Sequence, residues 1–141
     1  MKRSILKNLS IVVLIASLSG CRTLGLAPSD EELIHSTVSR WKTAMVTKNL
    51  DKLTACYSEN YTNSRGDNKE SMGELMTKAF NSGFMDNVEI NMEKAQIIIE
   101  QQTAKFGPID FISDRGVWPM ELTLQKEKGK WLITGSEGLQ Q

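Results

Sequence analysis

The spacing of apolar residues changes once along this chain, and the change limits the folds that the chain can adopt. Between residues 30 and 83 apolar side chains recur every three or four positions, which is typical of amphipathic helices. From Asn87 onward they recur at every second position, as in strands that bury one face. Helices that precede a set of strands, rather than alternating with them, indicate an α+β fold.

Three helices are expected before the sheet. The first begins at Ser29, which has capping-box spacing with Glu32, and ends near Asn49, which we expect in a left-handed conformation. A short second helix covers residues 50–57. The third begins where Asp67 and Glu70 repeat the capping-box spacing, and it ends at Gly83.

The strands are expected to bend. Within residues 88–99 the apolar residues change parity once, which predicts a single strand interrupted by a β-bulge. Gly107 and Pro108 mark a second bend, and Gly129 is placed for a hairpin turn. We therefore expect a curved, mostly antiparallel sheet whose concave face holds the three helices.

The first twenty residues have the composition of a secretory signal. Basic residues precede an apolar run at residues 9–18, and Ser19 and Gly20 supply small side chains ahead of Cys21. The run is only about ten residues, about half of what a membrane-spanning helix needs. We expect residues 1–20 to be removed, residues 21–29 to form a tether, and residues 30–141 to form one domain.

The sequence LSGC at residues 18–21 resembles the lipobox of bacterial lipoproteins. The resemblance implies that Cys21 becomes the first mature residue and carries acyl chains, which would anchor the protein to a membrane of the cell envelope. With Arg22 next, the resemblance implies the outer membrane, facing the periplasm, if the source is Gram-negative. The alternative is an ordinary signal peptide that is cleaved nearby.

Composition excludes several kinds of function. Three of the 17 basic residues lie in the signal, so 14 basic residues face 17 acidic ones and nucleic-acid binding is disfavoured. Cys56 is then the only free thiol and His35 the only histidine, too few for a zinc site. We expect Cys56 in the core, His35 at the surface, and neither a metal nor a cofactor.

Two stretches carry a resemblance to a known superfamily. Residues 39–63 (SRWKTAMVTKNLDKLTACYSENYTN) contain a long helix, an Asn-Leu-Asp link and a short helix that ends in an aromatic residue. Residues 122–137 (LTLQKEKGKWLITGSE) contain a last hairpin with its Trp. Both resemble the nuclear-transport-factor-2-like superfamily, which includes SnoaL-like polyketide cyclases and ketosteroid isomerases. The resemblance implies a cone that can hold a small apolar ligand, and often a homodimer formed through the outer sheet surface.

The residues that isomerases of this superfamily use are only partly matched. Trp41 occupies the position of a helical tyrosine, and Arg65 lies at or near the position of the base, with Asp67 two residues further on. Asp110 is a candidate for a third, protonated carboxyl group. An isomerase, dehydratase or cyclase would have to use Asp110 or Asp67 as its base.

Aromatic residues on the faces expected to turn inward are the candidates for ligand contact. They are Trp41, Tyr57, Tyr61, Phe80, Phe84, Phe111 and Trp118. Two hypotheses remain: an envelope lipoprotein without catalytic activity that binds a small apolar molecule or a protein partner, and an enzyme of the isomerase or cyclase kind.

Overall fold

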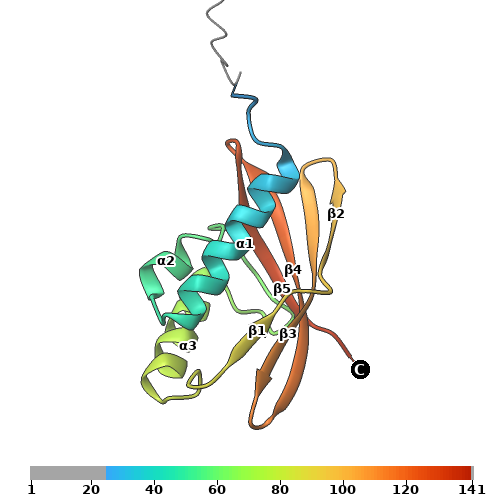
Figure 1. The fold of residues 1–141 in the computed structure, drawn as a ribbon. Helices are drawn as coiled ribbons and strands as arrows, with labels where there is room; N and C mark the ends of the chain where they lie inside the picture. The colour runs from blue at the N-terminus through green and yellow to red at the C-terminus, as the bar shows by residue number, and fades with distance from the viewer. Residues whose placement is uncertain (1–24, 141) are drawn as a thin grey trace, which may run out of the picture.

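The computed structural model describes residues 25–140, and the expected signal and Cys21 lie outside them. Three helices, α1 (Asp30–Val46), α2 (Leu50–Thr54) and α3 (Lys69–Asn81), precede the strands. The strands are β1 (Glu89–Asn91), β2 (Gln96–Glu100), β3 (Thr103–Ser113), β4 (Gly116–Glu127) and β5 (Lys130–Gly138). All neighbouring strands pair antiparallel, and the helices lie against one face of a strongly curved sheet (Figure 1). The predicted α+β class is confirmed.

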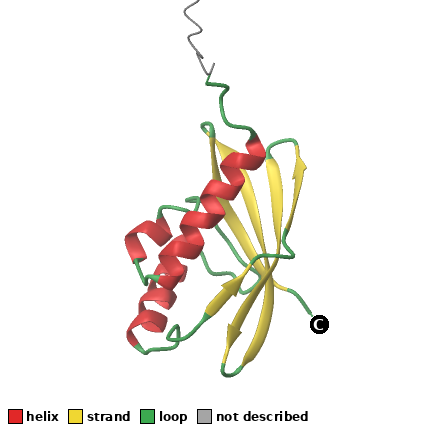
Figure 2. Ribbon diagram, in the orientation of Figure 1, coloured by secondary structure: helices red, strands yellow, loops and turns green. Residues whose placement is uncertain are grey.

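The sheet is curved along β3, the strand that pairs with β1, β2 and β4. Strand order is β1-β3-β4-β5, and β2 pairs with β3 beside β1 (Figure 2). The register of β3 against β4 shifts between Phe106 and Ile109, where Gly107 and Pro108 lie. A Cβ on Gly107 would come within 3.1 Å of the Glu121 backbone, so glycine permits this close approach. The predicted bend is therefore present.

The prediction of one bulged strand over residues 88–99 is wrong. The chain instead forms two strands, β1 and β2, joined by a turn in which the Ala95 amide donates to the Met92 carbonyl at 3.0 Å. Both strands pair with β3, β1 at Asp110 to Ile112 and β2 at residues 103–107. A turn between two strands changes the parity of the apolar residues just as a bulge does, so parity alone could not separate the two.

The helix starts follow the predicted positions to within a residue, but α2 ends at Thr54, three residues before the predicted end at residue 57. Ser29 and Glu32 form the expected capping box of α1. The left-handed residue that follows α1 is Lys48 (φ 53°) and not the predicted Asn49. Asn49 is instead the N-cap of α2. Helix α3 is capped by Asn68 with Ser71, so the predicted capping pair of Asp67 and Glu70 is wrong by one position.

The core lies between α1 and the concave face of the sheet. On β4, Leu122 and Leu124 are fully buried, and on β5 Trp131 and Ile133 are buried beside them. Helix α1 is tied to β5 because the Thr37 hydroxyl donates to the Trp131 carbonyl at 2.8 Å and the Trp131 indole donates to Asp30 at 2.9 Å. Among residues 25–140, no helix is long and apolar enough to cross a membrane.

Candidate binding pocket

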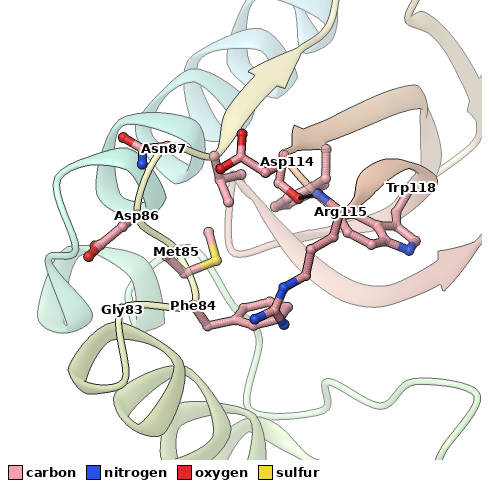
Figure 3. A pocket seen from close by; sticks show the side chains of 11 residues that line it. Gly83, Phe84, Met85, Asp86, Asn87, Asp114, Arg115 and Trp118 are labelled. Atoms are coloured by element: carbon pink, nitrogen blue, oxygen red, sulfur yellow. Dashed lines mark hydrogen bonds between the residues drawn. The ribbon is translucent and has the colours of Figure 1, made fainter.

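A pocket of about 230 Å³ opens at the end of the sheet where α1 finishes. It lies between the α3–β1 loop and the hairpin that joins β3 to β4 (Figure 3). Its lining residues come from these two segments: Gly83, Phe84, Met85, Asp86, Asn87, Val88, Phe111, Ser113, Asp114, Arg115 and Trp118.

Left-handed residues shape the loop side of the pocket. Gly83 (φ 74°) ends α3, and Asn87 (φ 59°) turns the chain into β1. Asp86 forms an ion pair with Lys48 at the end of α1, which ties the loop to the helix. The loop is therefore tied to the end of α1 through Asp86, and Phe84 on the same loop has 54% of its surface exposed.

The register of β3 against β4 positions the residues that line the hairpin side of the pocket. Phe111 on β3 is directly opposite Trp118 on β4, so both side chains lie on the concave face of the sheet. Phe111 packs edge-on against Trp41, with ring centroids 5.9 Å apart, whereas Trp118 is 46% exposed. Phe111 thus joins the core to the pocket, and Trp118 forms its outer wall.

Arg115 at the hairpin turn adds a positive charge. Its guanidinium carbon lies 5.6 Å from the centroid of the Phe84 ring, a cation–π distance (Figure 3). Within residues 25–140, no carboxylate forms an ion pair with this guanidinium. The pocket therefore combines aromatic walls with a cation that an acidic group on a ligand could reach.

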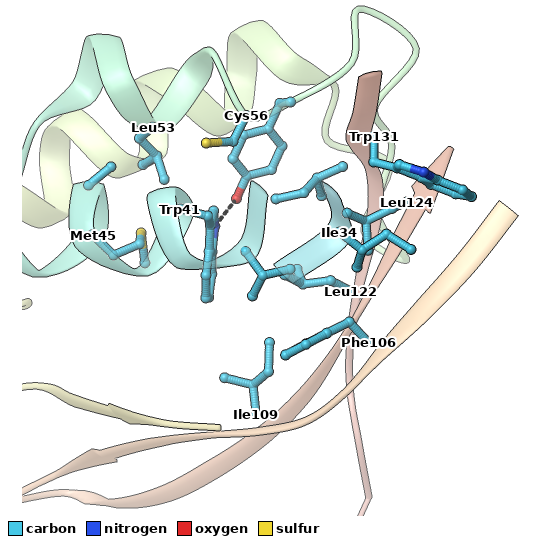
Figure 4. Close-up of a cluster of buried hydrophobic side chains, with 14 of the residues drawn as sticks. Ile34, Trp41, Met45, Leu53, Cys56, Phe106, Ile109, Leu122, Leu124 and Trp131 are labelled. Atoms are coloured by element: carbon cyan, nitrogen blue, oxygen red, sulfur yellow. Dashed lines mark hydrogen bonds between the residues drawn. The ribbon is translucent and has the colours of Figure 1, made fainter. Parts of the chain in front are cut away.

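Three other predicted ligand contacts lie in the core. The Trp41 indole donates a hydrogen bond to the Tyr57 hydroxyl at 2.9 Å (Figure 4). Tyr57 packs edge-on against Tyr61, whose hydroxyl lies 2.6 Å from that of Ser136. Burial raises the pKa of the Tyr57 hydroxyl. Every buried polar side-chain atom of the described residues has a hydrogen-bond partner, so the polar groups of these aromatic residues are satisfied inside the domain.

The structure brings together only part of the predicted set. Phe84, Phe111 and Trp118 line the pocket, and Phe80 packs partly buried against the core. Sequence reasoning missed Arg115 and Asn87, because turns lack the periodicity that identified the aromatic residues. An asparagine just ahead of the alternating run that becomes β1 is a local signal of a left-handed turn, and it could have drawn attention to this loop.

The two candidate carboxylates do not converge. Asp110 lies between Ile109 and Phe111, which face the core, so its side chain is on the outer face of the sheet. Asp67 instead accepts a hydrogen bond from the Asn63 side-chain amide at 2.8 Å and lies 3.6 Å from Arg65. Neither carboxylate lines the pocket described above.

The histidine, the cysteine and the carboxylates of the described residues do not form a metal site. Within residues 25–140, no three histidine, cysteine, aspartate or glutamate side chains gather closely enough to hold a metal ion. His35 is exposed and packs edge-on against Phe106, with ring centroids 5.8 Å apart. Cys56 is buried with a free thiol, as predicted.

Comparison with solved structures defines the class of fold. One similar structure is a protein of unknown function with a cystatin-like fold from Nostoc punctiforme PCC 73102, with 12% identity, a TM-score of 0.63, and coverage of 80% of this chain and 93% of that chain. Another is a nuclear-transport-factor-2-like protein of unknown function from Shewanella oneidensis MR-1, with 13% identity, a TM-score of 0.61, and coverage of 78% and 98%. The domain has the nuclear-transport-factor-2-like fold.

Fold similarity does not extend to an activity. A de novo designed protein with a curved β-sheet also matches, with 13% identity, a TM-score of 0.57, and coverage of 76% of this chain and 99% of that chain. Neither the models of known protein families nor the curated proteins match the sequence. Since one fold hosts unrelated functions, the fold alone does not identify an activity.

Proposed function

We propose that this protein is a binding module without catalytic activity, held at the envelope membrane by lipid on Cys21, which binds a small aromatic or apolar molecule. The observation that carries the proposal is the pocket formed by Phe84, Phe111 and Trp118. Exposed aromatic walls with a few polar groups at the rim are typical of small-molecule sites.

The placement of the carboxylates favours binding over the enzyme hypothesis. A general base must come within hydrogen-bond reach of the proton that it removes. Asp110 is separated from the pocket by the thickness of the sheet, and Asp67 is engaged by Asn63. The lining includes Asp86 and Asp114, but Asp86 is paired with Lys48, and Asp114 is an exposed residue of the β3–β4 turn. The arrangement therefore supports recognition of a ligand better than proton transfer within it.

A thermal-shift screen of the purified protein tests the binding proposal. The panel contains steroid-like, fatty-acyl and aromatic molecules, with and without a carboxylate that could pair with Arg115. A ligand that binds only the folded state raises the melting temperature. We expect a shift with an aromatic ligand that is lost in Trp118→Ala and in Phe84→Ala. Leu75→Ala is the matched control, since Leu75 is an exposed apolar residue of α3 outside the pocket.

The outcomes of this screen are distinct. No shift with any member of the panel would contradict small-molecule binding. A shift that survives both aromatic substitutions would place the site elsewhere. A chemical change in the ligand, detected by mass spectrometry after incubation, would favour the enzyme hypothesis instead.

The anchor is tested separately. Mass spectrometry of the mature N-terminus should find an acylated Cys21, and Cys21→Ser should leave an unprocessed precursor. Several acyl chains are needed for stable attachment, because each buried methylene contributes only about 0.8 kcal/mol. A free Cys21 thiol, or cleavage elsewhere, would contradict the anchor and leave the pocket proposal intact.

A further inference from the structure

The outer edge of β2 is open. β2 (Gln96–Glu100) pairs with β3 on one side only, and among residues 25–140 no strand or loop forms backbone hydrogen bonds with its other side. In Figure 1 this strand lies at the margin of the sheet with no element along its outer side. The opposite margin differs, because the Ser58 and Thr62 amides donate to carbonyls of Ile133 and Thr134 and cover part of β5.

This open edge is apolar on both faces of the sheet. Ile98 lies opposite Lys105 on the outer face and is 55% exposed. Ile99 lies opposite Ala104 on the concave face and is 41% exposed. Edge strands of natural proteins usually carry charges, prolines or bulges that prevent pairing with another chain. Within β2 the only such feature is Glu100, at the last position.

The sequence of β2 is complementary to itself in one register. If two copies pair antiparallel about Ile98, each Ile97 lies opposite the other copy's Ile99. Each Glu100 then lies opposite Gln96 of the other copy, so no like charges meet. Because opposed residues share a face, Ile98 meets Ile98 on the outer face, and Ile97 meets Ile99 on the concave face.

From this complementarity we infer that β2 is a docking edge for a second copy of the chain, which continues the sheet across a two-fold axis at Ile98. Main-chain hydrogen bonds join the copies, as in other cases of strand addition. The interface buries three isoleucines from each copy. It is isologous, so the dimer closes and leaves no free β2 edge.

The two-fold axis permits a charge-swap experiment at a single position. Sedimentation of the full-length protein in mild detergent should show a dimer that dissociates on dilution. Ile98→Lys and Ile98→Glu should each be monomeric, because each would place like charges opposite one another at the axis. Mixing the two variants should restore a heterodimer, since Lys then meets Glu. Leu75→Lys, which replaces an exposed leucine of α3 (43% exposed), should remain dimeric.

Circular dichroism melting of each variant separates loss of pairing from loss of folding. A wild-type protein that stays monomeric at high concentration would overturn the inference. So would an Ile98→Lys variant that still dimerises, which would place the interface on another surface. A mixture of the two folded variants that fails to associate would exclude the register centred on Ile98.

Discussion

At the scale of single residues, the interior of the domain depends on polar groups that satisfy one another. Trp41 on α1 and Tyr57 after α2 are both buried and share one hydrogen bond. Tyr61 is also buried, but its hydroxyl partner Ser136 is only partly buried. The two tyrosines therefore offer a matched pair for measuring the cost of an unsatisfied buried donor.

Tyr57→Phe should lower the free energy of unfolding by about 1–3 kcal/mol, because it leaves the Trp41 indole N–H buried without an acceptor. Urea denaturation measures this difference. Tyr61→Phe should cost less, since water can replace the lost partner near Ser136. Equal costs for the two substitutions would contradict the assigned role of the Trp41–Tyr57 bond.

The thiol of Cys56 gives a second residue-scale prediction. Burial raises its pKa, so little thiolate is present near neutral pH, and the thiolate is the reactive form. Alkylation by iodoacetamide should be slow in the folded protein and should accelerate with rising pH and with added denaturant. Rapid alkylation of the folded protein at neutral pH would show that Cys56 is accessible.

At the scale of elements, helix α3 shows what a capping pattern can and cannot predict. The spacing of Asp67 and Glu70 matches a capping box, as does the spacing of Asn68 and Ser71, and the structure uses the second pair. Asp67 is instead bound by Asn63, a contact that sequence spacing cannot reveal. Which of two adjacent caps is used depends on such contacts outside the helix.

Asn68→Ala should therefore destabilise the domain by about 1 kcal/mol, since it removes the side-chain acceptor for the Ser71 amide. Glu70→Ala should change stability by a few tenths of that amount at most, because Glu70 is exposed and is not part of the cap. Thermal or urea unfolding of the two variants measures this difference in stability. A larger effect at Glu70 would favour the cap that the sequence pattern suggested.

Sequence periodicity predicted the elements better than the site. Alternation of Trp118, Met120, Leu122 and Leu124 correctly placed one face of β4, because burial of a sheet face requires that alternation. The pocket depends on where the α3–β1 loop meets the β3–β4 hairpin. Residues such as Asn87 and Arg115 reach it through left-handed turns and strand register, neither of which leaves a periodic pattern.

At the scale of the whole molecule, the two ends of α1 lie in different surroundings: the N-terminal end is next to the expected tether, and the C-terminal end is next to the pocket loop. Its N-terminal end follows residue 25 and carries Asp30, whose pKa is lowered by Lys126 and the Trp131 indole. Its C-terminal end leads to Lys48, which holds the pocket loop through Asp86. With the proposed anchor at Cys21, the pocket opens at the end away from the tether, and we expect its ligand to arrive from the aqueous side.

The three tryptophans of the chain report on these regions within one spectrum. Trp118 forms the pocket wall, Trp41 touches Phe111 from the core, and Trp131 is bound to Asp30 at the other end of α1. An amide NMR spectrum of nitrogen-15-labelled protein resolves their indole N–H signals as a ligand from the screen is titrated. We expect the largest shift at Trp118, a smaller one at Trp41 and none at Trp131. A Trp118 signal that stays fixed at saturating ligand, or that moves less than the Trp131 signal, would contradict binding in the pocket lined by Trp118.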